Sequence, residues 1–215
     1  MKNIINLVKM NYSNLNAVKK MIILPLVIFV PVSVINPMFL NMLIGVIFFN
    51  ITQTVIAYED SYGIDTLIGY LPVKRSEYVI SRYVSGILNI GIATCIFIIC
   101  YYLADKYSTD NWTLLPYGIT LGIAITAAIT GLAIIIPCIL KFGAVKGRTI
   151  VTLLMIIVLM IPAILSQVLV ENKILESVLI KLNTLSMPLI FVGINIIILT
   201  VSYMITQRLY VKKEI

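Results

Sequence analysis

Long apolar stretches, interrupted by short polar segments, run through most of the chain. Residues 21–57 contain no charged side chain. Because a helix needs about 20 apolar residues to cross a bilayer, this stretch is too long for one span and suits two, with a turn near residues 33–40. Single spans are expected at four further stretches, namely 83–104, 116–140, 149–170 and 187–207. The pattern therefore predicts an all-α integral membrane protein with six transmembrane helices and one domain over residues 1–215.

The composition excludes an ordinary soluble domain. Of the 215 residues, 60% are hydrophobic and 12% are charged, whereas soluble domains are about half apolar and a quarter charged. The chain contains no histidine, which excludes imidazole general bases and histidine-ligated metals. Its three cysteines lie within apolar stretches, and we interpret them as small core residues rather than as disulfides or metal ligands.

Positive charge is distributed unevenly between the segments that connect the predicted spans. One set of segments, which includes both termini, carries thirteen lysines and arginines: Lys2, Lys9, Lys19, Lys20, Lys74, Arg75, Arg82, Lys141, Lys146, Arg148, Arg208, Lys212 and Lys213. The opposite set carries Lys106, Lys173 and Lys181. Since cytoplasmic loops are enriched in lysine and arginine, we expect a protein of the cell membrane with both termini in the cytoplasm. Topology explains the net charge of +7, so no nucleic-acid partner is needed.

Residues 1–20 form an arm with a helical pattern. Its apolar side chains fall on one face, at Ile4, Ile5, Val8, Tyr12 and Leu15. Polar side chains fall largely on the other face, at Lys2, Asn6, Lys9, Ser13, Asn16 and Lys20. The arm is predicted to be an amphipathic helix at the cytoplasmic surface of the membrane. A plain membrane anchor without a further role is the alternative.

The predicted spans contain no acidic or basic side chain between their flanks. Ion-coupled carriers and intramembrane proteases usually need such groups inside the membrane, so both classes are disfavoured. The most polar stretch within a span comprises Asn50, Thr52, Gln53 and Thr54. Interhelical hydrogen bonding is the simplest role for these side chains. The alternative is a polar lining near the cytoplasmic mouth of a transport pathway.

The fourth span carries a small-residue motif at Gly118 and Gly122. Small residues let neighbouring helices approach each other closely. Because such a motif is common in apolar sequence, we expect it to serve packing within the chain rather than a dimer interface.

The connection at 58–82 is longer than two neighbouring spans require, and it is patterned. It opens with an acidic pair, and Gly63 interrupts it. A short amphipathic stretch then runs to Leu71, where Pro72 ends it. A basic pair follows, and a second helix leads into the third span. One interpretation is a solvated loop that only fixes topology. The other is a short helix that docks on a cytoplasmic partner.

The order of these features resembles the ABC-2 type permease family. The resemblance is carried by Leu71-Pro72-Val73-Lys74-Arg75 and by the following Tyr78-Val79-x-Ser81-Arg82-Tyr83. More narrowly, the chain is similar to small six-span bacterial permeases that include the membrane subunits of staphylococcal phenol-soluble-modulin exporters. The resemblance implies a half-transporter that pairs with a second copy or a sister permease and recruits separate ATPase subunits. The chain has no GxxxxGK[ST] phosphate loop, so ATP and magnesium would bind to the partner, and this chain would need no cofactor.

The resemblance also implies roles for particular segments. Residues 1–20 would be the connecting helix, 58–82 the coupling loop that touches the ATPase, and 171–186 an outer loop. The implied coupling residues are Glu59, Asp60, Gly63, Asp65, Leu67, Leu71, Pro72, Lys74, Arg75 and Arg82. Apolar, charge-poor spans suit the export of amphipathic peptides or lipid-like cargo. The function expected is therefore that of an exporter permease. A membrane scaffold or assembly factor without transport activity is the alternative, and an intramembrane enzyme is disfavoured.

Overall fold

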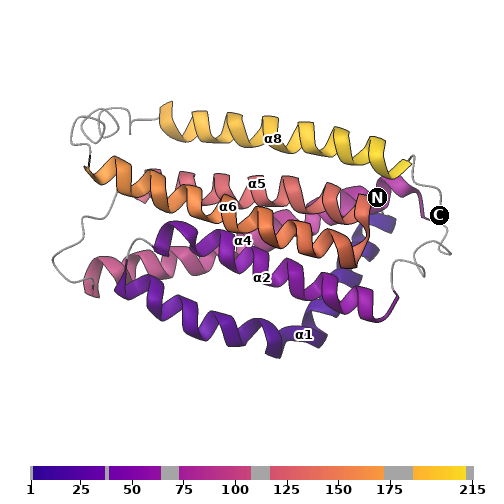
Figure 1. Ribbon diagram of the computed structural model, residues 1–215, viewed down its shortest axis with the longest axis horizontal. Coiled ribbons are helices and arrows are strands. Elements are labelled where there is room, and N and C mark those ends of the chain that lie inside the picture. Colours follow the sequence, from indigo (N-terminus) through magenta and orange to yellow (C-terminus); the bar gives the residue numbers. More distant parts are fainter. Residues whose placement is uncertain (1, 37–38, 64–72, 108–116, 172–185, 212–215) are drawn as a thin grey trace.

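The computed structural model describes residues 2–36, 39–63, 73–107, 117–171 and 186–211, and these residues form helices without any strand. The helices in chain order are α1 (Lys2–Ile35), α2 (Leu40–Ser61), α4 (Arg75–Tyr107), α5 (Tyr117–Phe142), α6 (Ala144–Glu171) and α8 (Ser186–Val211). The predicted turn near 33–40 falls where α1 ends and α2 begins. The predicted arm and first span are one continuous helix, α1, which changes direction along its length (Figure 1).

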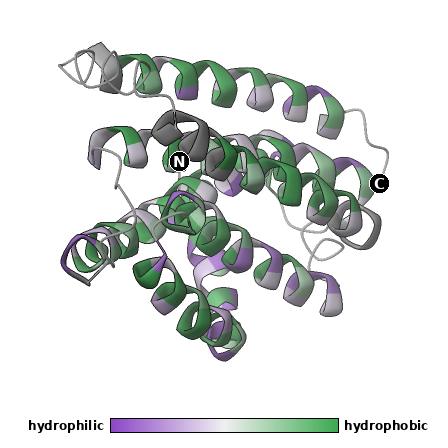
Figure 2. Ribbon diagram, turned by 60° about the vertical axis from the view of Figure 1, so that its left-hand side comes forward, coloured by the Kyte–Doolittle hydropathy of each residue, from purple (hydrophilic) through white to green (hydrophobic). Residues whose placement is uncertain are grey.

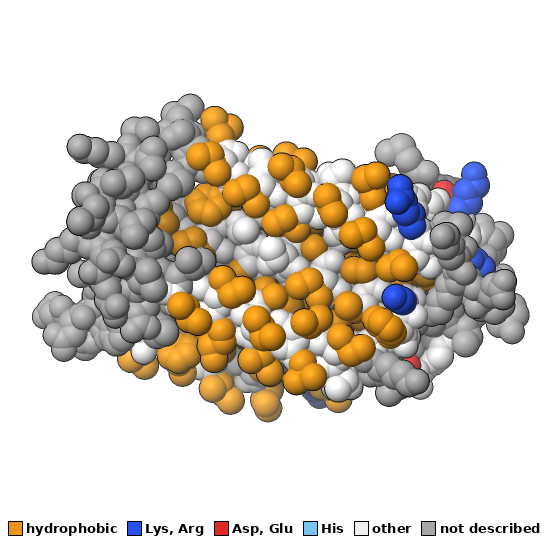
Figure 3. Space-filling view, turned by 45° about the horizontal axis from the view of Figure 1, so that its top comes forward, with side chains coloured by type: hydrophobic (Ala, Val, Ile, Leu, Met, Phe, Trp, Pro, Cys, Tyr) orange, Lys and Arg blue, Asp and Glu red, His pale blue; other side chains and the backbone are white. Residues whose placement is uncertain are grey.

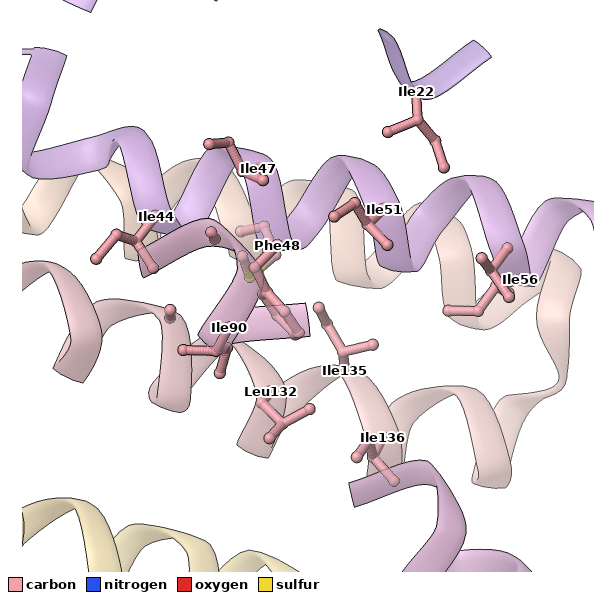
Figure 4. Packing of buried hydrophobic residues seen from close by; sticks show 14 of the residues in the cluster. Ile22, Ile44, Ile47, Phe48, Ile51, Ile56, Ile90, Leu132, Ile135 and Ile136 are labelled. Carbon is pink, nitrogen blue, oxygen red and sulfur yellow. The ribbon is translucent and has the colours of Figure 1, made fainter. Parts of the chain in front are cut away.

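The helices pack as a bundle in which α2 and α5 are central. Helix α1 packs on α2 and α4, α6 packs on α5 and α2, and α8 packs on α5 and α4. Figure 1 shows α1 and α8 at opposite edges, with both chain termini at one end of the bundle. We name this end the terminal end. The core lies between α2 and α5, where the buried Phe48 faces Leu132 and Ile135 (Figure 4).

The surface between the two ends of the bundle is apolar. Five described helices are long and apolar enough to cross a membrane, and α6 contains a further apolar helical stretch, Thr149–Ile161. Most helical turns are hydrophobic (Figure 2), and apolar side chains cover the middle of the molecule while lysines and arginines gather at the terminal end (Figure 3). An apolar band of this kind needs lipid around it. The chain is therefore a multi-pass membrane protein.

Helix α8 has apolar side chains on its outward face and polar side chains on its inward face. Its outward side chains include Leu189, Ile196 and Ile197, which are more than half exposed, whereas Ser202 and Thr206 are buried. The Tyr83 hydroxyl of α4 lies 2.6 Å from Ser202 Oγ and 2.8 Å from Thr206 Oγ1. Polar groups thus meet inside the bundle and apolar groups face outward, which is the reverse of a soluble helix.

Aromatic side chains gather at the end opposite the terminal end. The rings of Tyr101 and Tyr117 meet edge to face with centroids 5.1 Å apart, and Tyr102 stacks on Tyr117 at 6.5 Å. Tyrosine is enriched where membrane helices meet the headgroup region. This cluster fits the second membrane interface.

One residue of the small-residue motif in the fourth span, Gly122, packs within the chain. A Cβ atom placed on Gly122 would lie 2.6 Å from the Phe191 ring of α8. Gly118, by contrast, is exposed. Gly122 therefore lets α8 approach α5 closely, as expected for an intramolecular contact.

Candidate functional site

A buried ion pair joins α2 to α4 near the terminal end. Arg82 Nη2 lies 2.5 Å from Glu59 Oε2, and the two side chains are 16% and 4% exposed. Glu59 belongs to the last turn of α2 and Arg82 to an early turn of α4. The pair therefore links α2 to α4, the two helices that the connection at 64–72 joins in the sequence. A buried charge is tolerated in such a place only when it is paired and hydrogen-bonded.

Neutral side chains complete the surroundings of this pair. Arg82 Nε and Nη2 donate to the Tyr78 hydroxyl at 3.1 and 2.6 Å, and the guanidinium lies 5.0 Å from the centre of the Tyr78 ring. Arg82 Nη1 donates to Asn11 Oδ1 at 3.3 Å, and Asn14 Nδ2 donates to Glu59 Oε1 at 3.2 Å. Both charges are thus also bonded to α1. We name these five residues the polar hub.

The N-terminal part of α1 runs alongside α4. Asn3 donates to Glu77 at 3.1 Å, and Asn11 donates to Ser85 at 3.0 Å. Both pairs are separated by 74 positions, so the two helices run side by side in the same direction. The arm is therefore attached to the bundle over several turns, through a row of side-chain hydrogen bonds.

The face that the arm turns inward differs from the apolar face expected from the sequence. Leu7, Asn11 and Val18 are buried, whereas Ile5 is 54% exposed. The predicted face grouped side chains by hydrophobicity, but the contact with α4 is made partly by amides. Asn3, Asn11 and Asn14 were not predicted as functional residues from the sequence. Together with Leu7, Val18 and Ile22 they are spaced four, four, three, four and four residues apart, which places all six on one helical face. This spacing is the signal that could have found them.

A pocket of about 70 Å³ opens beside the polar hub. Helices α1, α2, α4 and α5 all contribute to its walls. Arg82 and Glu59 lie on the polar side, and the α5 side is formed by aliphatic side chains, Ile135, Ile136, Ile139 and Leu140. The pocket can hold a small apolar group with polar atoms at one edge.

The expected coupling residues divide into three groups. Glu59 and Arg82 come together inside the bundle. Asp60, Gly63, Lys74 and Arg75 are exposed at the ends of α2 and α4. The remaining four, Asp65, Leu67, Leu71 and Pro72, lie outside the described residues, as does most of the outer loop at 171–186. Gly63 has a φ of 62°, a backbone conformation that glycine adopts readily and that commonly ends a helix.

The polar stretch of α2 makes no hydrogen bond to another helix among the described residues. Thr54 Oγ1 donates to the Asn50 carbonyl of its own helix at 2.8 Å. The Asn50 Oδ1, Thr52 Oγ1 and both polar atoms of the Gln53 amide are buried without a partner in the described part of the chain. Of the four residues, Thr52 lines the pocket. Within the described residues, the interhelical bonds that were the simplest role expected for this stretch are not found.

Comparison with known proteins identifies the class of molecule. The sequence model of a family described as ABC-2 family transporter protein matches residues 6–211. No similar curated protein and no similar solved structure was found. Within the described residues, no group of three or more side chains suited to metal binding occurs.

Proposed function

Because the chain belongs to the ABC-2 transporter family, we propose that it is the permease subunit of an ATP-driven exporter. Family membership implies association with ABC ATPase subunits. The observation that carries the proposal is the family match over residues 6–211, in a chain whose helices present an apolar surface. ATP would bind to and be hydrolysed by the separate ATPase subunits.

The polar hub suggests how a movement of the ATPase reaches the membrane helices. The connection at 64–72 lies in the sequence between α2, whose last turn contains Glu59, and α4, in which Arg82 is seven residues after the first. Since these two residues form a buried ion pair, a force on the connection acts on both helices together. Asn11 and Asn14 extend the same unit to the arm. ATP-driven closure of the ATPases would then shift α1, α2 and α4 as one body between two states of the pathway.

Cargo, pairing and location complete the proposal. The apolar walls support export of amphipathic peptides or lipid-like molecules rather than ions. A second copy or a sister permease would supply the other half of the pathway. The gathering of lysines and arginines at the terminal end (Figure 3) supports the cytoplasmic side of the cell membrane as the location of both termini.

Charged substitutions in the coupling segment test the proposal. Leu67→Asp combined with Leu71→Asp replaces two apolar side chains of the segment that we propose to dock on the ATPase. Losing such contacts costs a protein interface about 2 kcal/mol or more, so ATPase binding should weaken about 30-fold. Export into sealed vesicles and ATP hydrolysis by the reconstituted complex are the measurements.

Thr66→Asp is the matched control, because it adds a negative charge to the same segment at a polar position. We expect this variant to export like the wild type. The variant with both leucines replaced must first be shown to insert normally. Full export by this variant would then contradict the coupling role of the segment.

A further inference from the structure

Two adjacent residues of α4 contact different parts of the bundle. Arg82 bonds to α2 and α1 within the polar hub. Tyr83, the next residue, is buried and contacts α8, where its hydroxyl meets those of Ser202 and Thr206. Consecutive positions of a helix with 3.6 residues per turn point about 100° apart. This part of α4 therefore holds neighbours on two of its sides.

The hydroxyls of Tyr83, Ser202 and Thr206 form a connected set of hydrogen bonds, which we name the hydroxyl junction. Ser202 Oγ donates to the Ala133 carbonyl of α5 at 2.8 Å. A serine hydroxyl has one hydrogen, so at the 2.6 Å contact Tyr83 donates and Ser202 accepts. Thr206 Oγ1 lies 2.8 Å from the Tyr83 hydroxyl and 2.8 Å from the Ser202 carbonyl, and it can donate to either. The junction therefore links α4, α8 and α5.

Two aromatic contacts also attach α8 to α4. The Tyr83 and Tyr203 rings meet edge to face with centroids 5.8 Å apart, and the Tyr78 and Tyr210 rings lie 5.7 Å apart. Tyr78 belongs to the polar hub, where it accepts hydrogen bonds from Arg82. The C-terminal half of α8 is therefore attached to the same turns of α4 that carry the hub.

The N-terminal half of α8 packs on α5. Phe191 lies where a side chain on Gly122 of α5 would be. Ile196 and Ile197 are more than half exposed and face the lipid, which forms no directional bond with them. The C-terminal half, with its bonds to Tyr83, is thus the part of α8 that is able to follow α4.

We propose that Tyr83 is a positioning residue that makes the C-terminal half of α8 move with α4 when the ATPase acts. This inference rests on the proposed function and extends the moving unit from α1, α2 and α4 to α8. Ser202 is held from two sides, by Tyr83 of α4 and by the Ala133 carbonyl of α5, so a shift of α4 relative to α5 strains one of these bonds. Because Thr206 and the ring contacts also hold α8 to α4, the bond to Ala133 is the one that breaks.

Cross-linking between the ends of α5 and α8 tests the proposal. Ser202 and Ala133 are 69 positions apart, and the same separation places Arg208 opposite Ile139, close to Lys141. Both basic residues are exposed. Lys141→Cys and Arg208→Cys are introduced into a chain whose native cysteines are replaced by alanine. The measurement is the rate of cross-linking by a flexible bis-maleimide in the purified complex in lipid discs, without nucleotide and after trapping with ATP and vanadate.

Trapping should change the cross-linking rate at least about twofold, as for a shift of packed helices by about 1–2 Å. Tyr83→Phe keeps the ring and removes the hydroxyl, so it should abolish this change while ATP hydrolysis continues. Thr206→Val should reduce the change, and Thr206→Ser, which keeps the hydroxyl, should restore it. A purely structural role of Tyr83 would instead alter the rate without nucleotide and leave the ATP-dependent change in place.

Tyr203→Phe is the matched control. It makes the same substitution beside the junction, but the Tyr203 hydroxyl has no hydrogen bond within the described residues. We expect this variant to keep the full ATP-dependent change. Thermal unfolding in detergent shows that each variant is folded before its cross-linking is compared.

Three results would overturn the inference. The first is a full ATP-dependent change in Tyr83→Phe. The second is equal loss of the change in Tyr203→Phe and Tyr83→Phe. The third is a constant cross-linking rate in the chain with Tyr83 intact while the complex hydrolyses ATP. In each case a complex that hydrolyses ATP leaves the proposed function standing. A complex that contains no ATPase subunit would defeat the proposed function and the inference with it.

Discussion

Arg82 and Glu59 are charged side chains held inside a bundle whose described core is otherwise neutral. Moving each charge out of water costs several kcal/mol, and the pair recovers this only through close contact and additional hydrogen bonds. Those bonds come from Tyr78, Asn11 and Asn14. Removing either charge therefore leaves the other buried and unpaired.

We predict that Arg82→Met lowers the free energy of unfolding by about 3–5 kcal/mol, because Glu59 remains as an uncompensated buried charge. Replacing both partners, as Glu59→Leu with Arg82→Met, should recover most of this loss. Thermal unfolding of the purified protein in detergent measures both effects.

Lys19→Met is the control for this pair of variants, since Lys19 is exposed on α1 and its loss should change stability little. If Arg82→Met unfolds at the wild-type temperature, Arg82 and Glu59 do not form the buried pair described above.

The sequence identified Glu59 and Arg82 as candidate residues but not their contact. Both stood out as charges in a patterned connection between spans. Their contact depends on how α2 and α4 pack side by side. A local sequence pattern does not contain this information. Asn11 and Asn14 were missed for a related reason. The role of an asparagine on a helix depends on which side chain of the neighbouring helix it bonds to, and the sequence does not show that partner.

At the scale of elements, close approach of α5 and α8 depends on Gly122. We predict that Gly122→Ala destabilises the protein by about 1–3 kcal/mol, because the added methyl group would overlap the Phe191 ring and force it to move. Thermal unfolding in detergent is again the measurement.

Gly91→Ala is the matched control, because a Cβ atom at Gly91 meets no other atom within 4 Å. Helix propensity alone should make this change neutral or slightly stabilising. Equal behaviour of the two alanine variants would show that α8 does not pack on α5 through Gly122.

The length and spacing of apolar stretches predicted the helices well. The turn at 33–40 and the position of α5 follow from apolar runs and prolines, which are local features. The continuity of α1 was not predictable in the same way. Its arm is polar and its later part apolar, and prolines at 25 and 31 lie inside the helix, which membrane helices tolerate. The inward face of the arm also escaped prediction, because it depends on contacts with α4.

At the scale of the whole molecule, we expect the distribution of charge to set the orientation in the membrane. We predict that a cysteine introduced at Asp105 reacts with a membrane-impermeant maleimide added to intact cells, whereas one at Ser61 does not. Both positions are exposed; Ser61 is the last residue of α2, and Asp105 lies in the last turn of α4. Figure 1 shows these two helix ends at opposite ends of the bundle. The experiment uses a background in which Cys95, Cys100 and Cys138 are replaced by alanine.

Labelling at Ser61 should appear once the cells are permeabilised, which controls for reactivity of that position. The reverse pattern, with Ser61 labelled in intact cells and Asp105 protected, would contradict the cytoplasmic location of the termini.

The central claim is that this chain is a permease driven by a separate ATPase subunit. Purification of the tagged chain from its native membranes in mild detergent, followed by mass spectrometry of stoichiometric partners, tests it most directly. We predict that an ATPase subunit with a phosphate loop is recovered, together with a second permease copy or a sister permease. An intact complex without any ATPase subunit would contradict the claim and favour a membrane scaffold instead.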